Sequence, residues 1–256
     1  MRLAGLSGRV ALVTGAGQGI GAAIASRLGA EGCRVAVNAL HPAKAEATAV
    51  CLRAGGAEAW AFPADVSDAG QVDAMVTGIE RELGRVEVLV NNAAYLEMER
   101  MLEQEVAVWS RMIDVDLTGP FICARRVLPG MLAARWGRVV MVASIWGLGG
   151  ARGATAYCAA KGGLVEMTRA MAAEVGPGGV SVTAIAPGVI DTPQLHADAA
   201  FAGITLEQMK ARYALGTLVG RIGSPAEIAG VVAFLASDEG SAFSGQTVPV
   251  TGGRSE

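Results

Sequence analysis

The sequence RVALVTGAGQGIG at residues 9–21 decides the fold that we expect for the whole chain. Residues 9–14 form a short apolar run of the kind that becomes a buried strand. A glycine-rich turn follows, and an alanine-rich helical pattern then continues to about Glu31. A strand, a glycine-rich turn and a helix in this order are typical of the first unit of a dinucleotide-binding fold.

Three glycines of this turn have separate physical roles. Gly15 permits the tight turn, Gly19 lets the backbone approach a phosphate, and Gly21 lets the helix pack closely on the strand. The amino terminus of the helix then presents free N–H groups and the positive end of its dipole to a pyrophosphate. A glycine-rich loop that binds no ligand is the alternative interpretation of this stretch taken alone.

Apolar runs and helical patterns alternate along the rest of the chain. The predicted strands lie at residues 33–38, 58–62, 86–90, 138–143, 180–185 and 246–250, and the predicted helices at 42–54, 68–83, 103–116, 120–135, 155–175 and 225–236. This alternation predicts an α/β fold, a Rossmann-like doubly wound parallel sheet of about seven strands with helices on both faces. Because no linker, repeat or low-complexity tract interrupts the pattern, we expect residues 1–256 to form one domain.

A second stretch, SIWGLGGARGATAYCAAK at residues 144–161, carries an arrangement that suggests chemistry. Tyr157 and Lys161 are four residues apart in a helical pattern, so both side chains lie on one face. A neighbouring ammonium favours the phenolate and lowers the pKa of a tyrosine toward the range useful for acid–base catalysis. Ser144 follows a predicted strand and can lie at the carboxyl edge of the sheet, where α/β proteins bind ligands. The alternative is a surface lysine that meets a half-buried tyrosine by accident.

Composition and charge exclude several classes of protein. The 256 residues carry a formal net charge of −3, with a pI near 5.5 and no basic block, so neither nucleic acid nor a membrane surface is an expected partner. No apolar run approaches the ~18 residues that span a bilayer, and we expect no signal peptide. Four scattered cysteines and two distant histidines indicate free thiols, a cytoplasmic protein and no metal site. The mean hydropathy of +0.41 suggests apolar subunit interfaces.

Further motifs follow in a fixed order along the chain. They are Asp65-Val66, NNA at 91–93, PGVIDT at 187–192, RIGSPAEIA at 221–229 and a glycine pair at 252–253. Together with TGAGQGIG at 14–21, Ser144 and YCAAK at 157–161, they resemble the short-chain dehydrogenase/reductase family in its common single-domain form. Several independent motifs with the right order and spacing are far more specific than any one of them.

The resemblance implies a cofactor-binding role for each matching position. The glycine loop would hold the pyrophosphate of a nicotinamide cofactor, Asp65 and Val66 the adenine, and residues 187–192 the nicotinamide carboxamide. Asn91 would lie under the cofactor ribose and steady the central strand. The implied cofactor-binding residues are Gly15, Gln18, Gly19, Ile20, Gly21, Asp65, Val66, Asn91, Ala93, Tyr157, Lys161, Pro187, Gly188, Ile190 and Thr192. Three have a purely structural alternative: Asn91 as a turn residue, Asp65 as a helix cap and Thr192 as a loop hydroxyl.

The resemblance also implies an activity. Tyr157 would be the general acid–base, Ser144 would hydrogen-bond the substrate oxygen, and Lys161 would bind the nicotinamide ribose and acidify the tyrosine. Hydride would pass between a nicotinamide and a ketone or secondary alcohol. The four-residue spacing of Tyr157 and Lys161 argues against the enoyl-reductase branch, whose similar motif has six intervening residues. A catalytically inactive dinucleotide sensor, and a dehydratase- or epimerase-like enzyme on the same scaffold, are the alternatives.

No acidic residue follows the second predicted strand, where NAD-binding proteins place the carboxylate that binds the ribose 2′-hydroxyl. Residues 38–41 are Asn, Ala, Leu and His, and Gln18 stands where an arginine is often found. The missing carboxylate favours NADP(H) over NAD(H). Asn38, His41 and Lys44 are the candidate contacts to the 2′-phosphate.

Three positions depart from the family pattern: Ala94 replaces a glycine, Thr251 an aspartate, and Asp116 an asparagine of the catalytic tetrad. If the side chain of Asp116 reached the catalytic pair, its charge would raise the pKa of the tyrosine. Alternatively only its backbone carbonyl acts, exposed by a helix break near residue 119, while the carboxylate turns to solvent or caps a neighbouring N–H. We expect this backbone role for Asp116 and an active enzyme.

Residues 193–216 mix Leu, His, Phe, Ile and Met without a clean period, as a mobile cover over a substrate would. We therefore place a substrate-covering segment at about 190–216. The substrate is expected to be a small-molecule carbonyl or alcohol. Two interpretations remain for Tyr95, Leu96, Trp146, Leu148 and Leu195. These residues line an apolar substrate pocket, or they belong to the ordinary packing of the protein.

The two helices predicted at 103–118 and 120–135 correspond to a pair that forms a subunit interface in the family that the chain resembles. With so apolar a composition, we expect a homotetramer, or at least a homodimer, built through them.

Overall fold

The computed structural model of the chain describes residues 2–253. Within them, seven strands form one parallel sheet in the order β3-β2-β1-β4-β5-β6-β7. The strands are β1 (Val10–Val13), β2 (Arg34–Val37), β3 (Ala59–Ala61), β4 (Val88–Asn91), β5 (Gly137–Val142), β6 (Val180–Pro187) and β7 (Thr247–Val250). The predicted α/β fold with a doubly wound parallel sheet is therefore confirmed.

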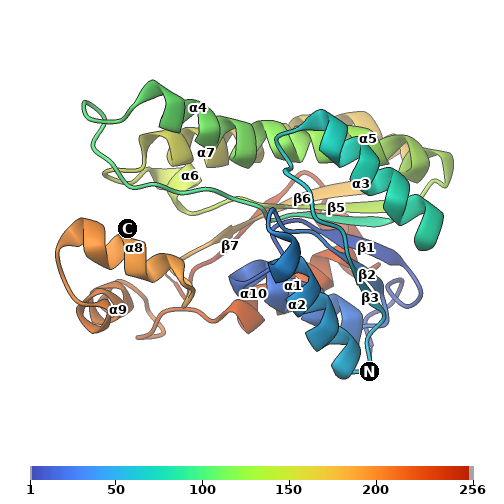
Figure 1. Cartoon of the computed structure of the whole chain (residues 1–256), viewed down its shortest axis with the longest axis horizontal. Coiled ribbons are helices and arrows are strands. Elements are labelled where there is room, and N and C mark those ends of the chain that lie inside the picture. Colours follow the sequence, from blue (N-terminus) through green and yellow to red (C-terminus); the bar gives the residue numbers. More distant parts are fainter. Residues whose placement is uncertain (1, 254–256) are drawn as a thin grey trace.

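Helices cover both faces of the sheet (Figure 1). One face carries α1 (Gly19–Ala30), α2 (Pro42–Ala54) and α10 (Pro225–Ala236). The other carries α3 (Ala69–Glu82), α4 (Val106–Ile113), α5 (Gly119–Ala133) and α7 (Thr155–Val175). Three further helices follow the carboxyl ends of β5 and β6, namely α6 (Trp146–Gly149), α8 (Gln194–Ala202) and α9 (Leu206–Leu215).

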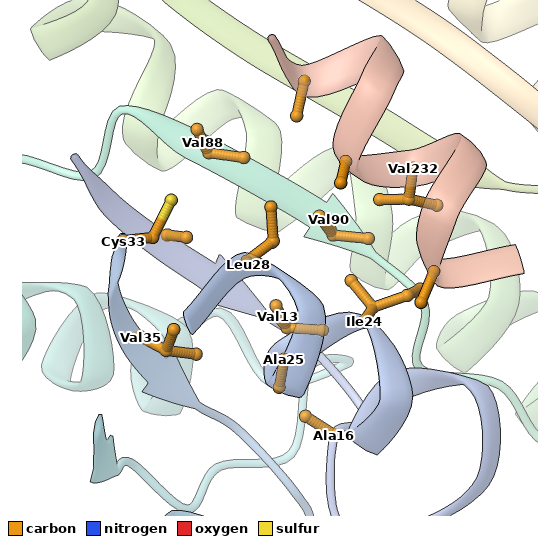
Figure 2. Close-up of a cluster of buried hydrophobic side chains, with 14 of the residues drawn as sticks. Val13, Ala16, Ile24, Ala25, Leu28, Cys33, Val35, Val88, Val90 and Val232 are labelled. Atoms are coloured by element: carbon orange, nitrogen blue, oxygen red, sulfur yellow. The ribbon is translucent and has the colours of Figure 1, made fainter. Parts of the chain in front are cut away.

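The core consists of two layers, one on each face of the sheet. In β1, Val13 points into the layer under α1, α2 and α10, whereas Leu12 points into the layer under α3, α5 and α7. Because helices cover both faces, every residue of β1 is buried and apolar, without polar alternation. Figure 2 shows the first layer, in which Ile24 of α1 lies near Val232 of α10.

The strand order reverses between β1 and β4, which are neighbours in the sheet although β2 and β3 separate them in the chain. Val13 at the end of β1 pairs with Val37 on one side and Val90 on the other. The connections that follow these two strands therefore diverge at the carboxyl edge. Open α/β sheets bind their ligands in the crevice that forms at this point.

The helix does not end near Gly119 as predicted, although a π-helix interrupts the α-helix there. Residues 106–133 continue through α4, a π-helix at Asp114–Thr118, and α5, and the N–H of Gly119 donates to the carbonyl of Asp114. Gly119 keeps helical dihedral angles, with φ −58° and ψ −52°, although Pro120 follows it. Proline disfavours this conformation in the preceding residue partly through that residue's Cβ, which glycine lacks.

Residues 193–216, for which the sequence predicts no helix, contain α8 and α9. A capping box formed by Thr205 and Gln208 begins α9. The buried positions of α8 are Leu195, Asp198 and Ala199, which have helical spacing. One of the three is a carboxylate, so the apolar period is interrupted and the helix is hidden in the sequence.

Candidate active site

A cavity of about 480 Å³ follows the carboxyl edge of the sheet. Its walls come from the segments after β1 to β6 and from α8. The wall includes the glycine-rich loop and residues 38–41 as well as Ser144, Tyr157 and Lys161. One continuous space thus joins the predicted cofactor loop to the predicted catalytic residues.

The glycine-rich loop is packed too closely for side chains at several positions, including Gly15 and Gly21. Gly15 has φ +62°, and a Cβ there would lie 2.7 Å from the Cα of Ala93. A Cβ at Gly21 would lie 2.4 Å from both the carbonyl oxygen of Gly15 and Nδ2 of Asn92. No side chain caps α1 at Gln18, so the N–H groups of its first turn are available to a ligand beside the cavity.

Asn92 clamps the glycine-rich loop against β4. Its Nδ2 donates to the carbonyls of Thr14 at 2.9 Å and Gly15 at 3.2 Å. The hydroxyl of Thr14 accepts the N–H groups of Asn92 and Ala93, each at 3.0 Å. Neither Asn92 nor Thr14 is among the predicted site residues, although both lie in the quoted motifs. Their position within these motifs was the sequence signal that could have identified them as site residues.

Asn38 holds the end of β2 against the segment after β3. Its amide nitrogen donates to the carbonyls of Phe62 and Ala64, each at 3.1 Å. Because both of its amide hydrogens are used, Asn38 has no donor left for a cofactor phosphate, which contradicts its selection as a 2′-phosphate contact. His41 and Lys44 also line the cavity and remain candidates.

Asp65 forms an ion pair at the same edge of the sheet. One carboxylate oxygen lies 2.8 Å from a guanidinium nitrogen of Arg111, and the other accepts the hydroxyl of Ser67 at 2.7 Å. Burial alone would raise the pKa of Asp65, but hydrogen bonds from Ser67 and Arg111 outweigh it and lower the pKa. Asp68, rather than Asp65, caps α3. Arg111 lines the cavity but is not among the predicted residues.

Ser144, Tyr157 and Lys161 line the same cavity. Oγ of Ser144, just after β5, accepts the N–H of Trp146 at 3.2 Å. Tyr157 and Lys161 lie one turn apart in α7, and the ammonium nitrogen lies 5.4 Å from the centre of the phenol ring. Lys161 is only 2% exposed and donates to the carbonyl of Val142 at 3.0 Å. The lysine is a buried cation, which rules out an accidental meeting at the surface.

Asp116 is fully buried, and its side chain faces Lys161. One oxygen accepts the N–H of Tyr95 at 2.7 Å, and the other lies 3.5 Å from Nζ of Lys161, an ion pair that is too long for a good hydrogen bond. Asp116 caps a neighbouring N–H as expected, but its contact with Lys161 contradicts the expected orientation of the side chain away from the pair. A buried carboxylate cannot be hydrated, so it is stabilised by nearby hydrogen-bond donors and by a nearby positive charge.

Burial shifts the pKa values of Tyr157 and Lys161 in opposite directions. Burial raises the pKa of Tyr157, and the negative charge of Asp116 raises it further, while a hydrogen bond with Ser144 works against both. Burial lowers the pKa of Lys161, and the attraction of Asp116 opposes that decrease. The expectation that the lysine holds the pKa of Tyr157 below its ordinary value is therefore wrong.

Asp116→Asn is expected to move the pH profile of alcohol oxidation toward acid. The asparagine keeps an acceptor for the N–H of Tyr95 but removes a negative charge that raises the pKa of Tyr157, so the phenolate forms at lower pH. At the optimum we expect kcat/KM to change by less than about tenfold. Profiles of kcat/KM from neutral to alkaline pH check this, and identical profiles for the two proteins would contradict it.

The cavity brings together most of the predicted site residues. Those that line it are Gly15, Gln18, Gly19, Ile20, Gly21, Asn38, Asp65, Val66, Ala93, Tyr95, Leu96, Ser144, Trp146, Tyr157, Lys161, Pro187, Gly188, Ile190, Thr192 and Leu195. Leu148 does not line it, because its side chain is half exposed on α6. Asn91 is buried behind the wall, where its Nδ2 donates to the carbonyl of Pro120 at 3.3 Å. Gln194 and Asp198 line the cavity without having been predicted.

Known proteins resemble the chain over nearly its whole length. A family model described as "Enoyl-(Acyl carrier protein) reductase" matches residues 15–255. The 3-oxoacyl-(acyl-carrier-protein) reductase FabG of Pseudomonas aeruginosa is 40% identical over 249 residues, which cover 97% of this chain and 98% of that protein. The 2-(S)-hydroxypropyl-CoM dehydrogenase 3 of Xanthobacter autotrophicus is 38% identical over 248 residues, 97% of each protein. The solved structure of an actinorhodin polyketide ketoreductase with NADPH has a TM-score of 0.92 and 34% identity, covering 98% of both chains.

Proposed function

Because this chain belongs to the short-chain dehydrogenase/reductase family and is an NAD(P)-dependent oxidoreductase, we propose that it interconverts a small-molecule ketone and a secondary alcohol with Tyr157 as the acid–base. The observation that carries the proposal is the buried Lys161 beside Tyr157, in a cavity shared with Ser144 and the glycine-rich loop. The four-residue spacing of Tyr157 and Lys161 supports carbonyl chemistry over enoyl reduction.

The described residues fit a nicotinamide dinucleotide. A side chain at Gly15 or Gly21 would clash with the loop, and the uncapped first turn of α1 offers N–H groups to a pyrophosphate. Asp65 and Val66 line the cavity where the adenine would lie, and residues 187–192 supply the wall for the carboxamide. When bound, the cofactor supplies or accepts the hydride.

The protein's own groups would orient the substrate and move one proton. Ser144 and Tyr157 both line the cavity, and their hydroxyls hold the substrate oxygen. Tyr157 donates its proton to that oxygen during reduction and removes the hydroxyl proton during oxidation. The buried charge of Lys161 stabilises the phenolate that remains after proton donation, in surroundings where charge interactions are stronger than in water.

Helices α8 and α9 form the substrate cover proposed at about 190–216. Gln194 and Leu195 of α8 line the cavity, and Lys210 of α9 forms an ion pair with Asp191 at 2.8 Å. This pair ties the cover to the segment that follows β6. In this proposal residues 1–256 act as one dinucleotide-binding and catalytic domain, with the cover opening to admit the substrate.

Turnover tests the proposed function. We expect the purified protein to consume reduced nicotinamide with members of a panel of sugar-derived, aliphatic and aryl ketones and oxoacyl thioesters, followed by absorbance. An inactive sensor would bind the cofactor without turnover, and a dehydratase- or epimerase-like enzyme would convert its substrate without net consumption of reduced cofactor. Either result across the whole panel overturns the proposal.

We propose NADP(H) as the preferred cofactor, with Lys44 as a contact to the 2′-phosphate. Nζ of Lys44 lies 2.9 Å from Oε1 of Gln18 at the cavity wall, and residues 38–44 contain no Asp or Glu. Lys44→Ala is expected to weaken NADPH binding about tenfold, or ~1.4 kcal/mol, and to change NADH binding less than about twofold. Calorimetric Kd values for both cofactors check this, and tighter binding of NADH by the parent protein contradicts the preference.

We also propose a homotetramer, or at least a homodimer, built through α4 and α5. These helices expose apolar side chains, including Val106 (79% exposed) and Phe121 (49% exposed), which a partner subunit would cover. Light scattering at micromolar concentration is expected to give a multiple of 26.0 kDa, and a clean monomer rejects this assembly.

Across residues 2–253 no helix combines the length and hydropathy that crossing a membrane requires. We propose a cytoplasmic location.

A further inference from the structure

Asp198 is a buried carboxylate in the cavity wall, and the proton transfer proposed above does not use it. It belongs to α8, is 6% exposed, and lines the cavity together with Ser144 and Tyr157. Charged side chains are almost never buried to this extent unless they are paired. Among residues 2–253, Asp198 forms no ion pair with a lysine, arginine or histidine, and Lys210 of the cover is paired with Asp191 instead.

Two side chains donate to Asp198, and both hydrogen bonds are long. Nε2 of Gln194 lies 3.4 Å from Oδ1, and the hydroxyl of Tyr213 lies 3.5 Å from Oδ2. An ionised carboxylate has about four acceptor positions, so two remain on a group that lines the cavity. Burial raises the pKa of Asp198, and the hydrogen bonds from Gln194 and Tyr213 offset this only in part.

Asp198 and Tyr157 line the same cavity and interact electrostatically. The charge of Asp198 contributes to the raised pKa of Tyr157, although burial and Asp116 contribute more. In the proposed function Ser144 and Tyr157 hold the reacting oxygen of the substrate. Asp198 lines the same cavity, so we expect it to face another part of the same molecule. A hydrogen-bond donor on that part would supply the partner that the carboxylate lacks, whereas a purely hydrocarbon substituent would leave the buried charge undercompensated.

We infer that Asp198 accepts a hydrogen bond from a donor group on the substrate, so that the enzyme prefers hydroxylated ketones and the corresponding diols to unsubstituted ketones and alcohols. This inference rests on the proposed oxidoreductase function. A carboxylate or phosphate group of the substrate at the same place would be repelled by the charge of Asp198. An ammonium group of the substrate would be attracted by the same charge, so the experiment below compares a substrate that carries an ammonium group with one that carries a hydroxyl.

Matched substrates isolate the donor group. The ketone 2-butanone is compared with 1-hydroxy-2-butanone and 4-hydroxy-2-butanone, which place a hydroxyl at two distances from the carbonyl. We expect at least one hydroxylated ketone to exceed 2-butanone in kcat/KM by more than about tenfold, mainly through a lower KM. In the oxidation direction, 1,2-propanediol is compared with 1-amino-2-propanol to separate hydroxyl from ammonium recognition.

Three variants assign the preference to Asp198. Asp198→Leu removes the acceptor at similar volume, and the preference is expected to fall below about threefold because KM for the hydroxylated ketone rises. For 2-butanone, kcat/KM is expected to stay level or rise, because the substitution removes a buried charge that a hydrocarbon substituent leaves undercompensated. Asp198→Asn keeps one acceptor oxygen without the charge, so it retains part of the hydroxyl preference and loses any ammonium preference. Tyr213→Phe removes a donor to the same carboxylate and is expected to keep the preference.

A purely structural role for Asp198 predicts a different result. If Asp198 only ties α8 to α9, Asp198→Leu and Tyr213→Phe lower Tm alike, and both ketones lose activity equally. That result overturns the inference, as does a parent enzyme without the preference or an Asp198→Leu enzyme that keeps it. If Asp198→Leu does not fold, Asp198→Asn tests the inference instead. When the parent recognises the ammonium group, Asp198→Asn should lose that recognition. When the parent does not, Asp198→Asn should lose part of the hydroxyl preference.

A binding measurement separates this inference from the proposed function. The rise in Tm caused by each ketone, with NADP⁺ present, reports binding without turnover. If no ketone is reduced while hydroxylated ketones still raise Tm more than 2-butanone in an Asp198-dependent way, the proposed function fails and the inference stands. If ketones are reduced but neither kcat/KM nor Tm distinguishes the pairs, the inference fails and the proposed function stands.

Discussion

Tyr157→Phe is expected to lower kcat by at least about a thousandfold, because positioned proton transfer contributes roughly 10² to 10⁴ to an enzymatic rate. The substitution removes only the hydroxyl. The ring that remains keeps its edge-on contact with Trp146, whose centroid lies 6.1 Å away, so the fold around the site is preserved. The loss should therefore appear in the chemical step, measured as single-turnover reduction of a substrate that the parent protein turns over.

Cofactor affinity is the control for Tyr157→Phe. The glycine-rich loop and residues 187–192 are unchanged, so the Kd for NADPH is expected to stay within about threefold, well under 1.4 kcal/mol. A variant that binds NADPH normally and reduces ketones at nearly the parental rate would show that another group transfers the proton. A variant that loses NADPH binding would instead indicate that the phenol hydroxyl holds the cofactor.

Lys161→Met is expected to destabilise the protein by about 3–5 kcal/mol as well as to abolish activity, because it leaves Asp116 as an uncompensated buried charge. The lysine is 2% exposed and its carboxylate partner 0% exposed, so neither side chain can turn to water without opening the core. Methionine fills most of the volume of lysine, so the expected loss comes from electrostatics rather than from a cavity. Urea unfolding at neutral pH measures it.

The double variant Lys161→Met with Asp116→Asn isolates the charge. Asparagine keeps an acceptor for the N–H of Tyr95 at position 116, and we expect the pair to recover at least about 2 kcal/mol over Lys161→Met alone. Burial already raises the folded-state pKa of Asp116 in the parent protein, where the charge of Lys161 opposes the rise, so removing the lysine should raise this pKa further. The deficit of Lys161→Met should then be small in acid and grow as pH rises from the folded-state pKa of Asp116 in the parent to that in the variant. A deficit that is independent of pH and unrelieved by the asparagine would point to lost packing.

The fold was predictable where local signals agree with one another. The predicted helices at 42–54 and 155–175 match α2 and α7 at both ends. For α2 the reason is visible in the sequence, since Pro42 occupies the first turn and Gly55 follows the last residue. The helix does not end near Gly119 as predicted, because a general rule about residues before proline does not apply to a residue without a Cβ.

The site was predictable where the identity of a residue dictates its chemistry. A tyrosine and a lysine one turn apart in a helix indicate a candidate proton donor, and in the structure both residues line the cavity. The contacts of Asn38, Asp116 and Asp198 were not predictable, because they depend on groups that are distant in the chain or on burial. An aspartate looks the same in a sequence whether it faces water or a buried ammonium.

The two helices that meet in Figure 2 come from opposite ends of the chain, which matters during synthesis on the ribosome. The apolar side of α1, with Ile24 and Leu28, emerges early and stays without its partner until α10 at Pro225–Ala236 has been made. Nascent chains with uncovered apolar surface are the ones that chaperones hold and that aggregate. Premature termination before α10 would therefore remove the whole enzyme from the cell, even though every predicted catalytic residue had already been translated.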